Sequence, residues 1–362
     1  MKNETFTKPI EIWINEDCLV AHLPLIPLLR HTKPPEIRPE IEFWNLIRNK
    51  LIGVIEVRYF KELEQAGSLV ATPHTLKDYF FDHKFDSVYQ FNRKVLESGR
   101  TLITFTGGIE YKPEPGEIVF ATSTYQSKTE TSISTPNWLY DFKSQVSPIP
   151  KPSVATVGFV GETQYPGRIN KLLSYLPIPE AMIQWLACSL FANRSLNLPM
   201  RMVIARLVRQ KVIKEVKNAS NLKLSLIERK GGFFTLPEAE RKRARAEYIQ
   251  NIQNNAYTLC MRGDENCSYR LYEVMSAGRL PVLIDTNMRL PDLGSLKWEE
   301  FCVIVPFSDL HQIGERIQAF HDNLSDEAFK EACMKSRAAF EYLSPENFIF
   351  KALKEQLPSL AV

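Results

Sequence analysis

The sequence predicts an α/β protein with two domains, each a Rossmann-like unit built around a parallel sheet. Short apolar runs with strand character alternate along the chain with segments of helical spacing, which is typical of this class. A stretch with three prolines at alternate positions, residues 147–153, divides the 362 residues into two parts of ordinary domain size. We therefore expect a first domain over residues 1–150 and a second over residues 151–345. A last helix, over residues 346–362, can cross back to the first domain.

The composition is that of a soluble globular protein, with 44% hydrophobic and 24% charged residues. The net charge of +3 is too small to indicate a nucleic-acid-binding protein. The amino-terminal residues lack the apolar core of a signal peptide, and no later run reaches transmembrane length, so we expect a cytoplasmic protein. Six cysteines are scattered without metal-binding spacing. Of these, Cys260 and Cys267 flank a glycine loop and would bridge only in an oxidising compartment.

In the first half, residues 40–58 have the spacing of a helix, and short apolar runs predict the strands. These runs are residues 10–14, 67–74, 88–91, 102–106 and 118–121. Strands alternating with helices indicate a Rossmann-like sheet, and the loops after Ala71 and Thr106 are expected at its carboxyl edge.

The second half starts with a strand over residues 156–161 that ends in glycine, followed by a loop and a helix from Arg168. A helix that includes residues 247–249 leads into the apolar run that begins at Tyr257. After residue 300 the pattern predicts one strand and three helices, over residues 303–305, 310–324, 325–343 and 347–357.

The clearest functional signal is a strand–loop–helix–strand unit that begins at Tyr257. Ser268 is a good N-cap for its helix, and Gly278 can end that helix in the left-handed conformation. Such a unit directs a helix N-terminus at the carboxyl edge of the sheet, where anions bind. Arg270, one turn into the helix, adds a guanidinium suited to phosphate, and Glu273 lies on the same side and can accept ribose hydroxyls. The pair predicts a nucleotide-binding site.

The same residues carry a family resemblance. The order Leu-Cys-x-Arg-Gly, Ser-Tyr-Arg-Leu-Tyr-Glu-Val-Met, x-Ala-Gly-x-x-Pro-Val, within residues 247–306, resembles the donor-binding core of the exostosin family of glycosyltransferases. The resemblance implies the GT-B fold, with two Rossmann-like domains facing each other across a cleft. It also implies a nucleotide-sugar donor, most simply a UDP-sugar, inversion at the sugar carbon, and no catalytic metal or other cofactor.

The donor-binding residues expected from this unit and from the resemblance are Gly263, Ser268, Tyr269, Arg270, Glu273 and Arg168. Asp-x-Asp, the usual metal-binding pair of metal-dependent glycosyltransferases, does not occur in the sequence. Fixed cations and helix N-termini are the natural substitutes for a metal at the diphosphate. Unlike the exostosins that the motif resembles, which are membrane-anchored and lumenal, this chain is expected to be cytoplasmic and bacterial.

A general base is expected from the first domain, within hydrogen-bond reach of the acceptor hydroxyl. Glu110 and His74 both follow predicted strands at the carboxyl edge. Glu110 ranks first because Gly107 and Gly108 before it would let a substrate approach, and a histidine beside Pro73 is more often a turn residue.

Residues 193–245 carry many more basic than acidic side chains. We interpret most of these charges as solvated helix faces. Attraction of an anionic donor, or peripheral docking on an acidic membrane surface that carries a lipid-linked acceptor, are the functional alternatives.

The expected partners are a nucleotide-sugar donor and a glycan or lipid-linked acceptor, and no nucleic acid. Two rival functions stay open at this point. One is a fucosyltransferase-like enzyme that uses a GDP-sugar. The other is a non-catalytic GT-B subunit that binds glycan or a partner glycosyltransferase.

Overall fold

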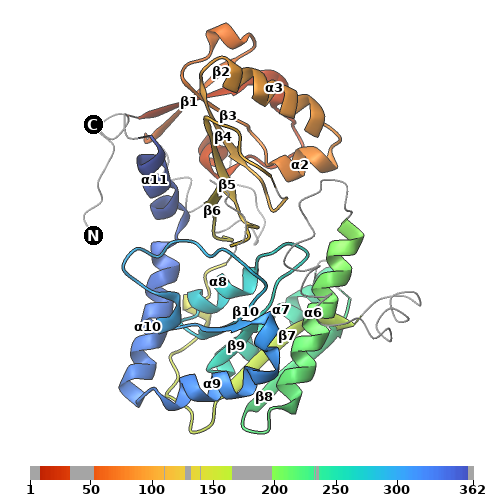
Figure 1. The fold of residues 1–362 in the computed structure, drawn as a ribbon, viewed down its shortest axis with the longest axis vertical. Coiled ribbons are helices and arrows are strands. Elements are labelled where there is room, and N and C mark those ends of the chain that lie inside the picture. The colour runs from red at the N-terminus through yellow and green to blue at the C-terminus, as the bar shows by residue number, and fades with distance from the viewer. Residues whose placement is uncertain are drawn as a thin grey trace. The chain divides into compact units, whose positions relative to one another are not determined.

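The computed structural model of the chain describes residues 9–32, 53–109, 111–126, 132–138, 140–164, 198–231, 233 and 236–357. The chain divides into two compact units, each with its own sheet (Figure 1). Unit 1 comprises Met1–Leu139, Arg289–Pro291 and Leu343–Val362, and unit 2 comprises Tyr140–Met288 and Asp292–Tyr342.

Unit 1 holds a six-stranded sheet in which every pair of neighbouring strands is parallel. The strand order is β2-β1-β3-β4-β5-β6. The strands are β1 (Ile10–Asn15), β2 (Ile55–Phe60), β3 (Leu69–Ala71), β4 (Thr101–Phe105), β5 (Glu117–Ala121) and β6 (Ile133–Ser134). The helices assigned to this unit are α2 (Leu76–Phe81), α3 (Phe85–Glu97) and α11 (Pro345–Gln356).

Two predictions for the first half are wrong. Residues 88–91 are not a strand but the middle of α3, whose buried residues Phe85, Val88, Asn92 and Val95 recur at helical spacing. The end of the helix predicted over residues 40–58 is instead β2, where isoleucine and valine pair in parallel with β1. The start of that predicted helix, up to residue 52, lies outside the described residues.

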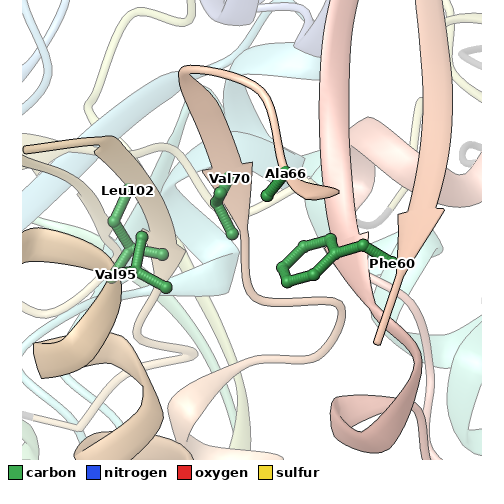
Figure 2. Close-up of a cluster of buried hydrophobic side chains, with 5 residues drawn as sticks. All are labelled: Phe60, Ala66, Val70, Val95 and Leu102. Atoms are coloured by element: carbon green, nitrogen blue, oxygen red, sulfur yellow. The ribbon is translucent and has the colours of Figure 1, made fainter. Parts of the chain in front are cut away.

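A buried apolar cluster packs α3 onto the sheet of unit 1 (Figure 2). It consists of Phe60, Ala66, Val70, Val95 and Leu102, which come from β2, β3, β4, α3 and the loop before β3. The helical spacing of α3 and the apolar runs of the strands therefore meet in one core, as an amphipathic helix on a parallel sheet requires.

Unit 2 holds a five-stranded parallel sheet with the order β11-β10-β9-β7-β8. Its strands are β7 (Thr156–Gln164), β8 (Lys223–Lys230), β9 (Tyr257–Cys260), β10 (Leu280–Asp285) and β11 (Val303–Pro306). Its helices are α6 (Leu198–Asn218), α7 (Glu238–Asn254), α8 (Tyr269–Ser276), α9 (Ile313–Asp322) and α10 (Asp326–Tyr342). The predicted strand–loop–helix–strand unit is present as β9, α8 and β10, and the α/β class with two Rossmann-like sheets is confirmed.

The strand order of unit 2 fixes where a ligand can bind. The first strand of this sheet in the chain, β7, lies second from one edge, β8 is added outside it as the edge strand, and β9, β10 and β11 follow on its other side. The direction in which new strands are added therefore reverses after β8, which places a switch point between the neighbouring strands β7 and β9. Open α/β sheets bind ligands at such a point, outside the carboxyl ends of the strands.

The helix α8 ends in a Schellman motif. Gly278 has a φ of 61°, its N–H donates to the carbonyl of Met275 (2.9 Å), and the N–H of Arg279 donates to Val274 (3.1 Å). The sequence-based prediction of a left-handed glycine after this helix is confirmed.

The proline-rich segment 147–153 is fastened to unit 2. The N–H of Ser147 donates to the Gln253 side chain (2.6 Å), and the guanidinium of Arg279 donates to the Ser147 carbonyl (2.7 Å). Further along, the Lys151 ammonium donates to the carbonyl of Leu324 (2.6 Å). These residues form part of the second unit, with the division of the chain falling between Leu139 and Tyr140.

Candidate functional site

Arg270 lies at the switch point of the unit 2 sheet. Its Nη2 donates to the carbonyl of Val160 on β7 (2.6 Å) and its Nη1 to the carbonyl of Leu259 on β9 (3.3 Å). The guanidinium stacks on Phe159 at 4.5 Å from the ring centroid, and Tyr248 of α7 lies at 5.5 Å. Carbonyls and aromatic rings therefore hold a positive charge between the ends of two neighbouring strands.

Glycine at position 161 makes this placement of Arg270 feasible. A Cβ atom at Gly161 would lie 3.0 Å from Arg270 Nη2 and 2.9 Å from the Phe159 ring. Any larger residue would push the guanidinium away from the Val160 carbonyl.

Ser268 is the N-cap residue of α8, as predicted, but its side chain does not cap the helix. The residue is 3% exposed, and its Oγ has no hydrogen-bond partner among the described residues. Buried hydroxyls normally have a partner, and the first N–H groups of a helix lack an intrahelical acceptor. The start of α8 therefore offers a hydroxyl without a described partner, next to Arg270 in the chain.

Glu273 lies one turn further along α8 and is held by α7. Its Oε2 accepts a hydrogen bond from the Tyr248 hydroxyl (2.6 Å), and Arg245 Nη1 lies 3.6 Å from its Oε1. Burial, followed by the Glu273 charge, raises the pKa of Tyr248, so the phenol stays protonated and donates. Glu273 is 8% exposed. A carboxylate has about four acceptor positions, so these two partners leave capacity for a ligand hydroxyl.

The other predicted donor residues of this loop differ in their surroundings. Tyr269 is 45% exposed at the first position of α8. Gly263 donates its N–H to the carbonyl of Cys267 (3.0 Å), which closes the loop. Gly263 does not adopt a positive φ, so its backbone conformation does not require glycine. A Cβ there would meet only Arg209 Nη2, at 4.0 Å, so the glycine leaves space in front of that guanidinium.

Two arginines of α6 belong to this edge and were not predicted individually. Arg206 is 8% exposed and donates from Nε (3.1 Å) and Nη2 (2.8 Å) to Glu162 Oε1, directly after the centre of β7. Arg209 donates from Nη1 to the carbonyl of Glu162 (3.3 Å). The interpretation of residues 193–245 as solvated faces is therefore wrong for this pair.

The sequence contained a signal for these arginines. Their neighbours Ala205, Leu207 and Val208 are all buried, which leaves α6 no wide polar face at this level. An arginine placed among apolar residues on a helix next to a strand end is a candidate for a buried charge.

The structure does not support His74 as a general base. The ring is 0% exposed, its Nε2 accepts the N–H of Val20 (2.9 Å), and its Nδ1 lies 2.9 Å from the carbonyl of Pro24. An accepting Nε2 requires the proton on Nδ1, so the neutral ring joins the loop after β3 to the segment after β1. Both nitrogens serve the fold.

Glu110 and Arg168, and with Arg168 the helix predicted from it, lie outside the described residues. Gly107, three residues before Glu110, is described, and the structure gives it a role other than letting a substrate approach. Gly107 has a φ of 64°, and a Cβ there would lie 2.5 Å from Thr75 Oγ1 at the start of α2. Close packing and backbone conformation require this glycine, independently of any substrate.

Within the described ranges, no group of three or more acidic, histidine or cysteine side chains is arranged to hold a metal ion. The five cysteines described, Cys260 and Cys267 among them, are free thiols. Burial raises the pKa of Cys260 to about 12, so this thiol is inert at neutral pH. None of the helices that the structure describes is both long and apolar enough to cross a membrane.

Comparison with known proteins links unit 2 to a family. Residues 154–320 match the family model described as the exostosin GT47 domain. Among solved structures, TarM is similar with a TM-score of 0.35 and 10% identity, over 73% of this chain and 51% of that one. A glycosyltransferase from Rickettsia africae ESF-5 is similar with a TM-score of 0.39 and 9% identity, over 98% of this chain and 99% of that one. The chain thus spans about half the length of TarM.

Proposed function

Because residues 154–320 match the exostosin GT47 domain model, we propose that the chain is an exostosin-family glycosyltransferase and that the carboxyl edge of the unit 2 sheet binds its nucleotide-sugar donor. The observation that carries this proposal is the guanidinium of Arg270, held by strand-end carbonyls beside the start of α8. A helix N-terminus with an adjacent guanidinium suits the diphosphate of such a donor.

The donor of this proposal is a UDP-sugar. Ser268 and Arg270 bind the diphosphate, and Glu273, oriented by Tyr248 and Arg245, accepts hydroxyl hydrogens from the ribose. Tyr269, Gly263 and Arg168 complete the donor site. These roles are proposals that follow from the chemistry of the side chains and from the family.

The reaction of this proposal is an inverting transfer without a catalytic metal. The acceptor hydroxyl attacks the sugar carbon from the face opposite the leaving diphosphate while a base removes its proton. Fixed cations at the leaving group supply the charge stabilisation that a metal provides in other enzymes. Glu110 is our candidate base. The acceptor is a glycan or a lipid-linked glycan, reached in the cytoplasm or at the inner membrane surface.

A thermal-shift screen of nucleotide sugars tests the donor assignment. A ligand that binds only the folded state raises the midpoint of unfolding, by about 2.7 kcal/mol of stabilisation at a concentration of 100 Kd. We expect UDP and at least one UDP-sugar to raise it, and GDP-sugars not to. If only guanosine nucleotides shift the midpoint, the fucosyltransferase-like alternative replaces this one.

Transfer itself is tested by release of UDP from the donor that the screen identifies. We expect release that depends on an acceptor, persists in excess EDTA, and is lost in Glu273→Gln. Binding of the donor without turnover under any acceptor would favour the non-catalytic subunit.

A further inference from the structure

Arg209 and Arg270 approach the same edge of one strand. Arg270 donates to the carbonyl of Val160 (2.6 Å) and Arg209 to the carbonyl of Glu162 (3.3 Å), two residues further along β7. Carbonyls two residues apart on a strand point to the same side and lie about 7 Å from each other. One guanidinium comes from α8 and the other from α6, so two separate helices bring positive charge to the switch point.

Neither guanidinium has an ion-pair partner among the residues that the structure describes. The nearest acid on β7, Glu162, is bound through its Oε1 to Arg206 Nε and Nη2. Arg206 thereby neutralises the carboxylate that would otherwise pair with Arg209. The result is an excess of positive charge at this place.

Burial and this excess of positive charge both act on the pKa of Arg209. Burial, and next the charge of Arg270, lower the pKa of Arg209 to about 10, against the opposing influence of Asp264 and Glu162. The group stays charged at neutral pH. Two partly buried like charges without an ion-pair partner among the described residues cost free energy, which a bound anion would recover.

We propose that Arg209 is a further donor-binding residue and that Arg209 and Arg270 together select a diphosphate, two adjacent phosphate groups, over a monophosphate. The inference rests on the proposed function, in which this edge binds a nucleotide. A diphosphate presents oxygens on two phosphorus atoms and can contact both guanidinium groups at once, whereas the single phosphate of UMP, which has a similar charge at neutral pH, spans a shorter distance.

Two further observations show room and donors for such a group. Among the described residues, a Cβ at Gly263 would have no atom within 4 Å other than Arg209 Nη2, so they leave the space beside this guanidinium open. The unpartnered Oγ of Ser268 lies at the start of α8 in a residue that is 3% exposed. Among the described residues, no side chain fills the space at Gly263 and none bonds to the Ser268 hydroxyl.

Calorimetric titration with UDP, UMP and inorganic pyrophosphate tests the proposal on the full chain. We expect wild type to bind UDP more tightly than UMP, and Arg209→Gln to lower the affinity for UDP and pyrophosphate by about 10- to 100-fold, the range of a charge-assisted hydrogen bond. The affinity for UMP should change much less, so the UDP-to-UMP ratio falls. Arg209→Lys should keep part of the preference.

The control is Arg243→Gln, which removes the same charge from an exposed position on α7. We expect it to leave the UDP-to-UMP ratio unchanged. We also expect Arg209→Gln to keep or raise the midpoint of thermal unfolding without ligand, because it removes an uncompensated charge. This second measurement separates loss of a contact from loss of the fold.

The outcomes distinguish this inference from the proposed function. If wild type binds UDP and a well-folded Arg209→Gln binds it equally, the role of Arg209 is overturned and the nucleotide site stands. If wild type binds pyrophosphate through Arg209 but no nucleotide, the diphosphate site stands and the proposed function fails. If it binds neither, both are overturned.

Discussion

At the scale of single residues, the site depends on arginines that the fold holds in place without neutralising them. The guanidinium of Arg270 has carbonyl and aromatic partners, and Arg206 occupies the carboxylate of Glu162. A buried charge is normally paired, so such an arrangement is expected where a ligand supplies the counter-charge.

Substitution of Gly161 tests how strictly Arg270 is placed. In Gly161→Ala the new Cβ would lie 3.0 Å from Arg270 Nη2, so we expect the guanidinium to shift and the affinity for UDP to fall about tenfold. Titration calorimetry measures this change. Gly67→Ala is a matched control in unit 1, where the Cβ would lie 2.4 Å from Trp13 Nε1. It should lower thermal stability but leave UDP binding intact, and equal UDP binding by Gly161→Ala would contradict the placement.

Ser268 allows a second test, because a capping serine and a ligand-binding serine respond differently to replacement by alanine. Loss of a capping side chain costs about 0.5–2 kcal/mol. The Oγ of Ser268 makes no capping bond. We therefore expect Ser268→Ala to leave the midpoint of thermal unfolding nearly unchanged while the affinity for UDP falls about five- to tenfold. A clear loss of stability with unchanged affinity would assign the serine to the helix alone.

At the scale of elements, the carboxyl end of α8 is defined by a feature that the sequence already contained. Its carboxyl end is the Schellman motif at Gly278, with a φ of 61°. This motif sends the chain directly into β10, and so fixes where the start of α8 lies relative to the ends of β7 and β9.

Alanine at Gly278 is expected to cost about 1 kcal/mol, because a Cβ is disfavoured in the left-handed conformation. The cost is conformational rather than steric, since the new Cβ would meet the carbonyl of Cys333 at an ordinary 3.6 Å. Gly278→Asn should therefore be less destabilised than Gly278→Ala. The thermal midpoint measures both. Gly263→Ala, at a position without positive φ, is the control and should leave it unchanged.

Glu117, at the first position of β5, predicts a pH dependence of unit 1. Burial raises the pKa of its carboxyl from the ordinary value of 4.5, so the unfolded chain ionises first as the pH rises. The folded state is then relatively most stable below the unfolded pKa and loses this advantage as the pH rises through the folded pKa. We expect Glu117→Gln to raise the thermal midpoint near neutral pH and not at roughly pH 4, whereas the exposed Glu114→Gln should do neither. An equal effect of Glu117→Gln at both pH values would contradict this.

Much of unit 2 could be predicted from the sequence because its signals are local. A capped amphipathic helix between two apolar runs specifies β9, α8 and β10 almost without tertiary information. The run at residues 88–91 misled because its three apolar or aromatic residues fit either a strand or a helix, and packing of α3 on the core decided the outcome. Arg209 was missed for a related reason, since its role depends on which strand end α6 passes.

At the scale of the whole molecule, the two units repeat one topological plan. The first five strands of each sheet in chain order take the spatial order 2-1-3-4-5, so each unit has a switch point between its first and third strands. In unit 2 this point carries the arginines of the proposed donor site. In unit 1 the segment after β1 and the loop after β3 are joined there by His74.

The difference between the two switch points agrees with different tasks for the two units. A donor diphosphate needs fixed cations, which unit 2 supplies through Arg209 and Arg270. An uncharged acceptor sugar does not need such cations, and the hydroxyls at the carboxyl edge of unit 1, on Thr72, Thr106 and Thr124, are buried and make hydrogen bonds within that unit. We accordingly assign donor binding to unit 2 and acceptor binding to unit 1 as part of the proposed function.

A crystal structure of the full chain grown with UDP tests the central claim most directly. We predict the diphosphate at the first turn of α8, within hydrogen-bond distance of Ser268 Oγ and the guanidinium groups of Arg270 and Arg209. We also predict the ribose hydroxyls at Glu273. UDP bound at another place in the molecule, with the start of α8 unchanged from the ligand-free protein, would contradict the account.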